Sequence, residues 1–165
     1  MAAPDTLLIQ YENFEHGRFT HVGRFGPGNQ FMAYLTYADP KYYHTEEVTP
    51  DGQIIWKRHT NCFAVLHLFG PSGDHLKSEV ERVSGERGSE EQDWAKLEEM
   101  ITRLGEVKLG DIRVKRFRVE VEKIVHGLIY ECELHEEDGR EIEWVMLQPN
   151  DIMFHPPWDS GEYST

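Results

Sequence analysis

The C-terminal tail holds the side chains whose types could most readily perform acid–base chemistry. Four titratable residues follow one another closely there: Asp151, His155, Asp159 and Glu162. Imidazole and carboxylate groups act as general acids and bases and also bind cations, so these side chains could meet around a proton or a cation. Pro156 and Pro157 favour a different outcome, in which a stiff, extended tail docks on the protein through Trp158. We expect docking, and we name no catalytic residue.

A second cluster of carboxylates belongs to a hairpin predicted near the C-terminal end. Counting back through a turn at residues 136–140 pairs Glu133 with Glu143 and places four carboxylates on the outer face: Glu131, Glu133, Glu141 and Glu143. Like charges that face each other across a strand pair destabilise that pair. We therefore expect these carboxylates either to be compensated by Arg113 and its neighbours or to receive an external cation.

The preceding strand carries four basic residues and looks at first like a stripe that binds nucleic acid. Its apolar alternation is regular only if Lys115 and Arg116 form a bulge. With that bulge and a turn at Glu122–Lys123, Arg113 lies opposite Glu131. The acidic neighbour would then remove most of the positive field that a phosphate group meets. We do not expect nucleic acid as a partner.

Other signatures of chemistry are weak. The chain has nine histidines, but none has HxH or HExxH spacing, and GxSxG, GxGxxG, P-loop and CxxC motifs are also missing. We expect His67, within an apolar strand, to be a hydrogen-bonded core residue, and we predict no metal and no cofactor. Cys62 and Cys132 also fall in apolar runs, so we expect both thiols to be buried and inert.

The long loop over residues 39–53 is the better candidate for recognition. It contains Tyr42 and Tyr43, and tyrosines at loop positions are frequent anchors of protein interfaces. The alternative is a loop that folds back onto the domain.

The elements that would position these residues are mostly strands. Turn signals such as Gly70–Gly73 separate short runs rich in Val, Ile, Phe, Tyr and Thr, which predicts hairpins in an antiparallel sheet. Apolar residues at helical spacing predict one amphipathic helix over residues 90–104, packed on one face of the sheet, with Gly105 as its cap. The fold class is therefore α+β, as a single domain over residues 1–165 with an extended Pro-rich tail from 149. About eight strands are expected, near residues 6–13, 18–25, 30–38, 60–69, 75–83, 111–121, 124–134 and 141–148.

Charge limits the partners. Thirty acidic residues against seventeen basic ones give a formal net charge of −13. Such a field repels nucleic acid and anionic membranes and attracts a basic protein surface, although an acidic surface also simply favours solubility. No apolar run is long enough for a membrane helix, and the start does not read as a signal peptide, so we expect a cytoplasmic protein.

Several segments also resemble a bacterial family whose members are often labelled formate hydrogenlyase regulatory proteins. The resemblance covers nearly the whole chain from about residue 18, and its motifs are turn and core residues: Gly28–Tyr34, Ala64–Gly70, Asp74–Leu76, Leu109–Ile112, Pro149–Phe154 and Pro157–Asp159. It implies a regulatory role through a protein partner, and it assigns no catalytic or binding residue.

These observations favour a non-enzymatic, acidic, cytoplasmic domain that binds another protein, one with a basic surface. The predicted binding residues are Tyr42, Tyr43, Glu131, Glu133, Glu141, Glu143 and Trp158. One alternative is an immunity protein that neutralises a basic toxin such as a nuclease, by charge complementarity. Another is a small enzyme that uses His155 and the carboxylates of the tail.

Overall fold

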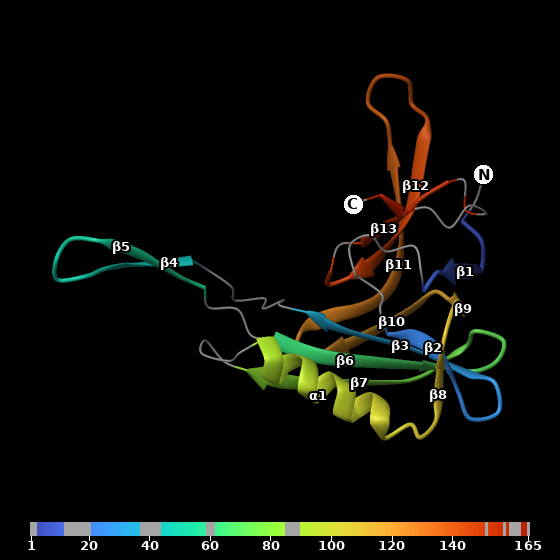
Figure 1. The fold of residues 1–165 in the computed structure, drawn as a ribbon. Helices are drawn as coiled ribbons and strands as arrows, with labels where there is room; N and C mark the ends of the chain where they lie inside the picture. The colour runs from blue at the N-terminus through green and yellow to red at the C-terminus, as the bar shows by residue number, and fades with distance from the viewer. Residues whose placement is uncertain are drawn as a thin grey trace.

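Antiparallel strands dominate the computed structural model of the chain (Figure 1). It describes residues 3–11, 21–36, 44–58, 62–84, 90–150, 152–156, 158 and 163–164. One helix occurs among these residues, which confirms the predicted α+β class, although the strands are more numerous than the eight expected. No helix in the described part of the chain is long and apolar enough to cross a membrane.

The central sheet is covered on both faces. Its five strands run in the order β7 (His75–Ser84), β6 (Cys62–Phe69), β3 (Asn29–Thr36), β2 (Val22–Phe25) and β8 (Val107–Leu109). Side chains alternate between the two faces of a strand. On β3, Phe31 belongs to one apolar cluster and Met32 to another, and both are fully buried. The central sheet therefore has an apolar layer on each side.

Helix α1 (Glu90–Thr102) covers the first of these faces. It buries Leu97, Met100 and Ile101 against the sheet, as the helical spacing predicts. The helix ends before Gly105, which has a φ of 86° and donates its N–H to the Thr102 carbonyl. A left-handed glycine at this position stops a helix, so the predicted cap is confirmed.

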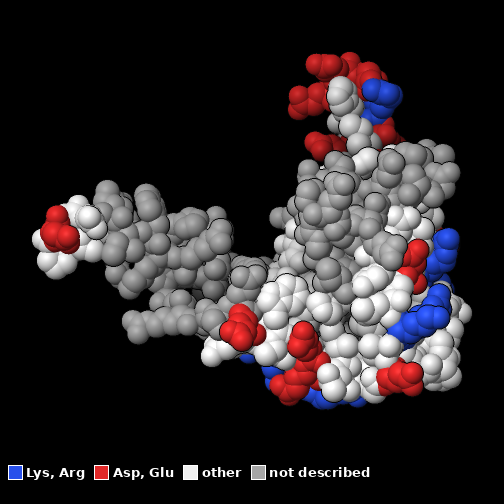
Figure 2. All heavy atoms as spheres, in the orientation of Figure 1, with Lys and Arg blue, Asp and Glu red and all other residues white. Residues whose placement is uncertain are grey.

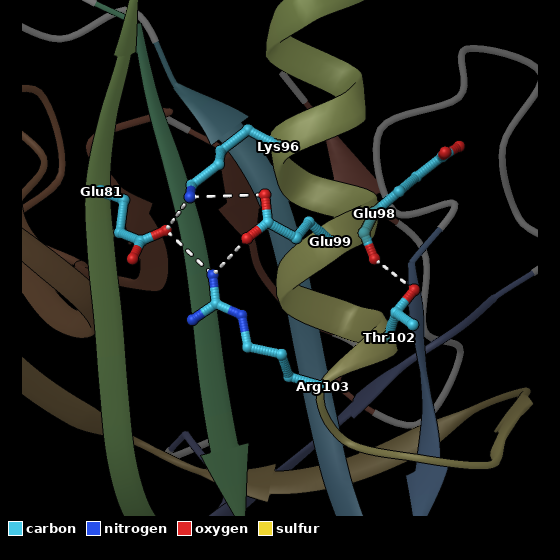
Figure 3. A network of polar contacts seen from close by, with 6 residues as sticks. All are labelled: Glu81, Lys96, Glu98, Glu99, Thr102 and Arg103. Atoms are coloured by element: carbon cyan, nitrogen blue, oxygen red, sulfur yellow. Dashed lines mark hydrogen bonds and ion pairs between the residues drawn. The ribbon is translucent and has the colours of Figure 1, made fainter.

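Four charged side chains connect α1 to the neighbouring strand β7 (Figure 3). Glu81 of β7 lies 3.2 Å from the Lys96 ammonium and 3.5 Å from the Arg103 guanidinium. Glu99 contacts the same two cations at 3.5 and 3.3 Å. Each pair is partly exposed and contributes at most about 1 kcal/mol, but together they fix how the helix lies along β7.

The hairpin that joins β6 and β7 turns at Gly70–Gly73, as the turn signal predicts. Ser78 lies opposite His67, and Val80 opposite Val65. A bulge near the turn then places His75, rather than Leu76, opposite Phe69. Leu76 is 58% exposed, because the bulge shifts the alternation of the strand by one residue.

A second sheet covers the other face of the central sheet. Its strands run in the order β10 (Phe117–Val121), β11 (Ile124–Leu134), β12 (Glu141–Gln148), β13 (Ile152–Phe154) and β14 (Tyr163–Ser164). The predicted turn between β10 and β11 is confirmed, with φ of 52° at Glu122 and 68° at Lys123. Two left-handed residues in a two-residue loop suit the twist of a hairpin.

Strand β9 (Ile112–Lys115) corrects one prediction. It pairs with the N-terminal strand β1 (Thr6–Ile9), so that Arg113 lies opposite Leu8 and not opposite Glu131. The expected bulge is a strand break at Arg116, after which β10 joins a different sheet. Arg113 therefore lies on another strand pair from the carboxylates it was expected to compensate.

The main core lies between the two sheets. Residues from β1, β2, β3, β6, β9, β10, β11, β12 and β13 contribute to this one cluster. A separate hairpin, β4 (His44–Val48) and β5 (Ile54–Arg58), extends away from these layers (Figure 1).

Candidate functional site: the acidic arm

The β11–β12 hairpin is longer than the sheet that carries it. Strand β10 pairs with β11 only as far as Leu128, and β13 pairs with β12 only as far as Val145. Residues 130–143 therefore form a two-stranded ribbon, which projects from the layers in Figure 1. We call this segment the acidic arm.

The arm carries an unusual density of charge. It contains seven acidic residues and one arginine, which is a net charge of −6 within fourteen residues: Glu131, Glu133, Glu136, Glu137, Asp138, Arg140, Glu141 and Glu143. Figure 2 shows acidic atoms gathered over the end of the arm. Arg140 is engaged with Asp138, whose Oδ2 lies 2.5 Å from its Nε. No other lysine or arginine of the described residues forms an ion pair with a carboxylate of the arm.

The register of the hairpin differs by one residue from the prediction. Glu133 lies opposite Ile142, and Glu143 lies opposite Cys132, so the expected Glu133–Glu143 pair is wrong. The loop spans residues 135–140 and closes with the His135 N–H donating to the Arg140 carbonyl. A shift of one residue sends each side chain of the second strand to the opposite face. The four glutamates are thus divided between two faces and do not form one cluster.

One face of the arm combines two of the glutamates with two apolar side chains. Glu131 lies opposite Trp144, whose Nε1–H donates to Glu131 Oε2 at 2.9 Å. Glu133 lies opposite Ile142, which is 44% exposed. This face presents carboxylates beside exposed hydrocarbon.

The other face carries Glu141 and Glu143. The Tyr130 hydroxyl donates to Glu143 Oε1 at 2.6 Å, and this hydrogen bond raises the pKa of the tyrosine. The Arg116 guanidinium lies 5.3 Å from the centre of the Tyr130 ring, which is within cation–π range. Leu134 shares this face and is 62% exposed.

One group on this second face could supply three ligand atoms to an ion. A thiol and two carboxylates lie with their ligand atoms within 4.8 Å of one another: Cys132, Glu141 and Glu143. Exposed carboxylates approach each other in this way on many acidic surfaces, and Glu143 already accepts the Tyr130 hydrogen bond. The geometry alone therefore assigns no ion here.

A groove of about 370 Å³ runs along the outer edge of β12, on the side away from β11. Its lining residues come from the arm and from the segment that follows β13: Arg140, Glu141, Ile142, Glu143, Trp144, Met153, His155 and Pro156. The Nδ1 atom of His155 lies 2.9 Å from the Pro156 carbonyl oxygen. The structure thus brings His155 to the predicted residues Glu141 and Glu143.

The remaining predicted residues lie elsewhere or outside the described part of the chain. Trp158 packs against the main core and is partly buried, in the place that a docking residue would take. Tyr42 and Tyr43 fall outside the described residues. So do three carboxylates of the tail, namely Asp151, Asp159 and Glu162.

Two histidines meet beside the main core, His67 fully buried and His75 partly buried. His67 is fully buried, with Nε2 2.7 Å from the Tyr34 hydroxyl and Nδ1 2.6 Å from the Ser78 hydroxyl. His75 contacts the same Ser78 hydroxyl at 2.7 Å and stacks on Phe117. Burial lowers the pKa of His67 well below its usual value, and the prediction of a hydrogen-bonded core histidine is confirmed.

The two cysteines have different environments. Cys62 is buried on β6, as predicted, but Cys132 is exposed on the arm, and that prediction is wrong. The apolar run around Cys132 leaves the core where β11 passes the end of β10.

Comparisons with known proteins gave no match. No family model fits the chain, and no curated protein or solved structure matches it. The acidic arm and its groove are therefore judged on their own chemistry.

Proposed function

We propose that this chain is a non-enzymatic domain that binds another protein, and that the acidic arm contacts a basic surface of that partner. The observation that carries the proposal is that, among the described residues, no lysine or arginine other than Arg140 forms an ion pair with the carboxylates of the arm. Arg113, which was expected to neutralise the carboxylates, pairs with β1 instead, and Arg140 is engaged at the tip. The arm therefore keeps a field that would attract and orient a basic protein.

Exposed hydrocarbon on the arm supports the same proposal. Five large hydrophobic side chains stand out as exposed among the described residues, and three of them belong to the arm: Tyr130, Leu134 and Ile142. Removing such apolar surface from water is favourable by roughly 25 cal/mol per Å², and this gain offsets part of the entropic cost of association. A contact that combines desolvated apolar side chains with opposite charges has both affinity and specificity.

The cytoplasm is the compartment that we propose for this interaction. Cys132 presents an exposed thiol, and such thiols stay reduced in the cytoplasm. A regulatory role through the bound partner is the function that the family resemblance implies.

The test is the capture of partners from a lysate of the source organism by tagged protein, at low and high salt. We expect a stoichiometric, salt-sensitive partner that is lost with Glu133→Lys combined with Glu141→Lys, since both side chains are exposed. The matched control is Glu91→Lys with Glu106→Lys, which changes the net charge equally at exposed positions outside the arm. A partner lost equally with both pairs would reflect net charge alone, and a partner kept by the arm variant would contradict the proposal.

A further inference from the structure

The outer edge of β12 is an open sheet edge along the arm. In an antiparallel pair, residues that exchange hydrogen bonds with the partner strand alternate with residues whose N–H and C=O point away. The His135 N–H donates to the Arg140 carbonyl, so the bonded pairs of this hairpin continue at Ile142 and Trp144. Glu141 and Glu143 therefore direct their backbone groups away from β11.

The same alternation explains where β13 attaches. Val145 and Leu147 also point their backbone groups outward, and β13 pairs with them through Phe154 and Ile152. The pairing ends there, and among the described residues no strand continues along Glu141 and Glu143.

Proline prevents the chain from closing this edge with its own next residues. After Phe154 come His155, Pro156 and Pro157. A proline has no N–H to donate to a sheet ladder. The segment stops being a strand at Phe154, and the groove of about 370 Å³ lies between Pro156 and the open edge.

We propose that this open edge binds an extended, basic segment of the partner protein as an added β-strand. The inference rests on the proposed function and specifies how the arm would recognise its partner. Backbone groups of Glu141 and Glu143 would pair with the added strand, as in other complexes formed by strand addition. A second copy of this chain is a poor occupant, because it would bring its own glutamates against these two.

The faces of the arm also define the sequence of the added strand. Residues next to Glu141 and Glu143 share their face and would be lysine or arginine. Residues next to Ile142 and Trp144 lie on the other face, beside exposed hydrocarbon, and would be apolar. The segment therefore alternates basic and apolar side chains.

The experiment uses a labelled hexapeptide of alternating lysine and valine, with binding to the full chain measured by fluorescence anisotropy. Two control peptides have the same sequence. In one the backbone nitrogens of the valines are methylated, and in the other those of the lysines are methylated. Both versions keep every side chain and charge. We expect saturable binding of the unmethylated peptide. Only one of the two methylated versions carries its methyl groups on the nitrogens that would pair with β12, and we expect its affinity to be about tenfold or more lower.

A pair of protein variants tests the edge from the other side. Glu143→Pro removes one outward N–H, and Glu143→Val removes the same carboxylate but keeps that N–H. We expect the proline variant to bind about tenfold more weakly than the valine variant. Circular dichroism checks that both variants fold. If the proline variant does not fold, the methylated peptides alone test strand addition.

Equal binding of all three peptides would overturn strand addition, and so would absence of peptide binding. Neither result touches the proposed function, which is judged by whether the Glu133→Lys and Glu141→Lys pair loses the captured partner. If the Glu133→Lys and Glu141→Lys variant loses the partner but methylation does not change the affinity of the peptide, the arm binds through charge alone.

Discussion

The Tyr34 hydroxyl lies 2.7 Å from Nε2 of His67, and both side chains are buried between the two sheets. The other nitrogen of the same imidazole reaches Ser78, so one ring connects β3, β6 and β7. A buried polar group that loses its partner costs about 1–3 kcal/mol. The hydrogen bonds of this ring therefore stabilise the fold, and removing one of them should measurably lower the free energy of unfolding.

Tyr34→Phe should lower the free energy of unfolding by about 1–3 kcal/mol, because His67 Nε2 would remain buried without its partner. Urea titration followed by tryptophan fluorescence measures the change. Tyr130→Phe is the control, since that hydroxyl bonds an exposed carboxylate, and it should change the free energy by less than about 1 kcal/mol. Equal effects of the two substitutions would show that the buried hydrogen bond stabilises the protein no more than the exposed one.

Stability should fall as the pH falls below about 6.5. Burial lowers the pKa values of His67, His75 and His126 in the folded protein, so the unfolded chain binds more protons in this range. The stabilisation is fully present above the unfolded pKa and is lost as the pH falls toward the folded values. Between pH 7.5 and 5.5 we expect a progressive loss of the free energy of unfolding, to which the fully buried His67 contributes, measured by urea titration at each pH. A free energy that is constant or rises toward pH 5.5 would contradict this account.

Gly127→Ala should destabilise the protein severely. Gly127 has a φ of 141°, and a Cβ built there would lie 2.1 Å from the Phe117 carbonyl oxygen on the neighbouring strand. We expect a loss of more than about 3 kcal/mol or a failure to fold, read from the thermal midpoint. Gly110→Ala is the control, because nothing lies within 4 Å of its added Cβ, and its midpoint should stay near that of the native protein.

Cys132 should react with a thiol reagent in the native protein, and Cys62 should react only after denaturation. The expected titre is one thiol per chain without denaturant and two with it. Cys132→Ser should abolish the native reaction and leave the denatured one. Two reactive thiols in the native protein would mean that Cys62, at the start of β6, is accessible to the reagent without denaturation.

The sequence predicts the fold well where periodicity and caps are local. The helix with Gly105 and the hairpin turns at Gly70–Gly73 and Glu122–Lys123 follow from residues close in the chain, and the structure confirms them. Pairing between distant segments was not predictable in the same way. Nothing local indicates that β9 leaves its neighbour β10 to pair with β1.

The predicted register of the arm was wrong for a different reason. Residues 144–147 are all apolar, so alternation alone does not say which two face the core. The structure buries Val145 and Leu147, whereas Trp144 and Met146 are only partly buried. The charge pattern carries the missing signal: a hairpin end with seven carboxylates does not lie in a core, so its apolar residues Leu134 and Ile142 are exposed with it.

The double covering of the central sheet has a consequence for how the molecule opens. Amide hydrogens of β3 and β6 are shielded by α1 on one side and by the second sheet on the other, so they can exchange with solvent only when a whole layer separates. No described strand or helix packs on the acidic arm beyond the ends of β10 and β13, so the arm can fray from its tip while both layers stay closed. The described fold thus combines a centre whose amides exchange only when a layer separates with an arm whose amides exchange by local opening.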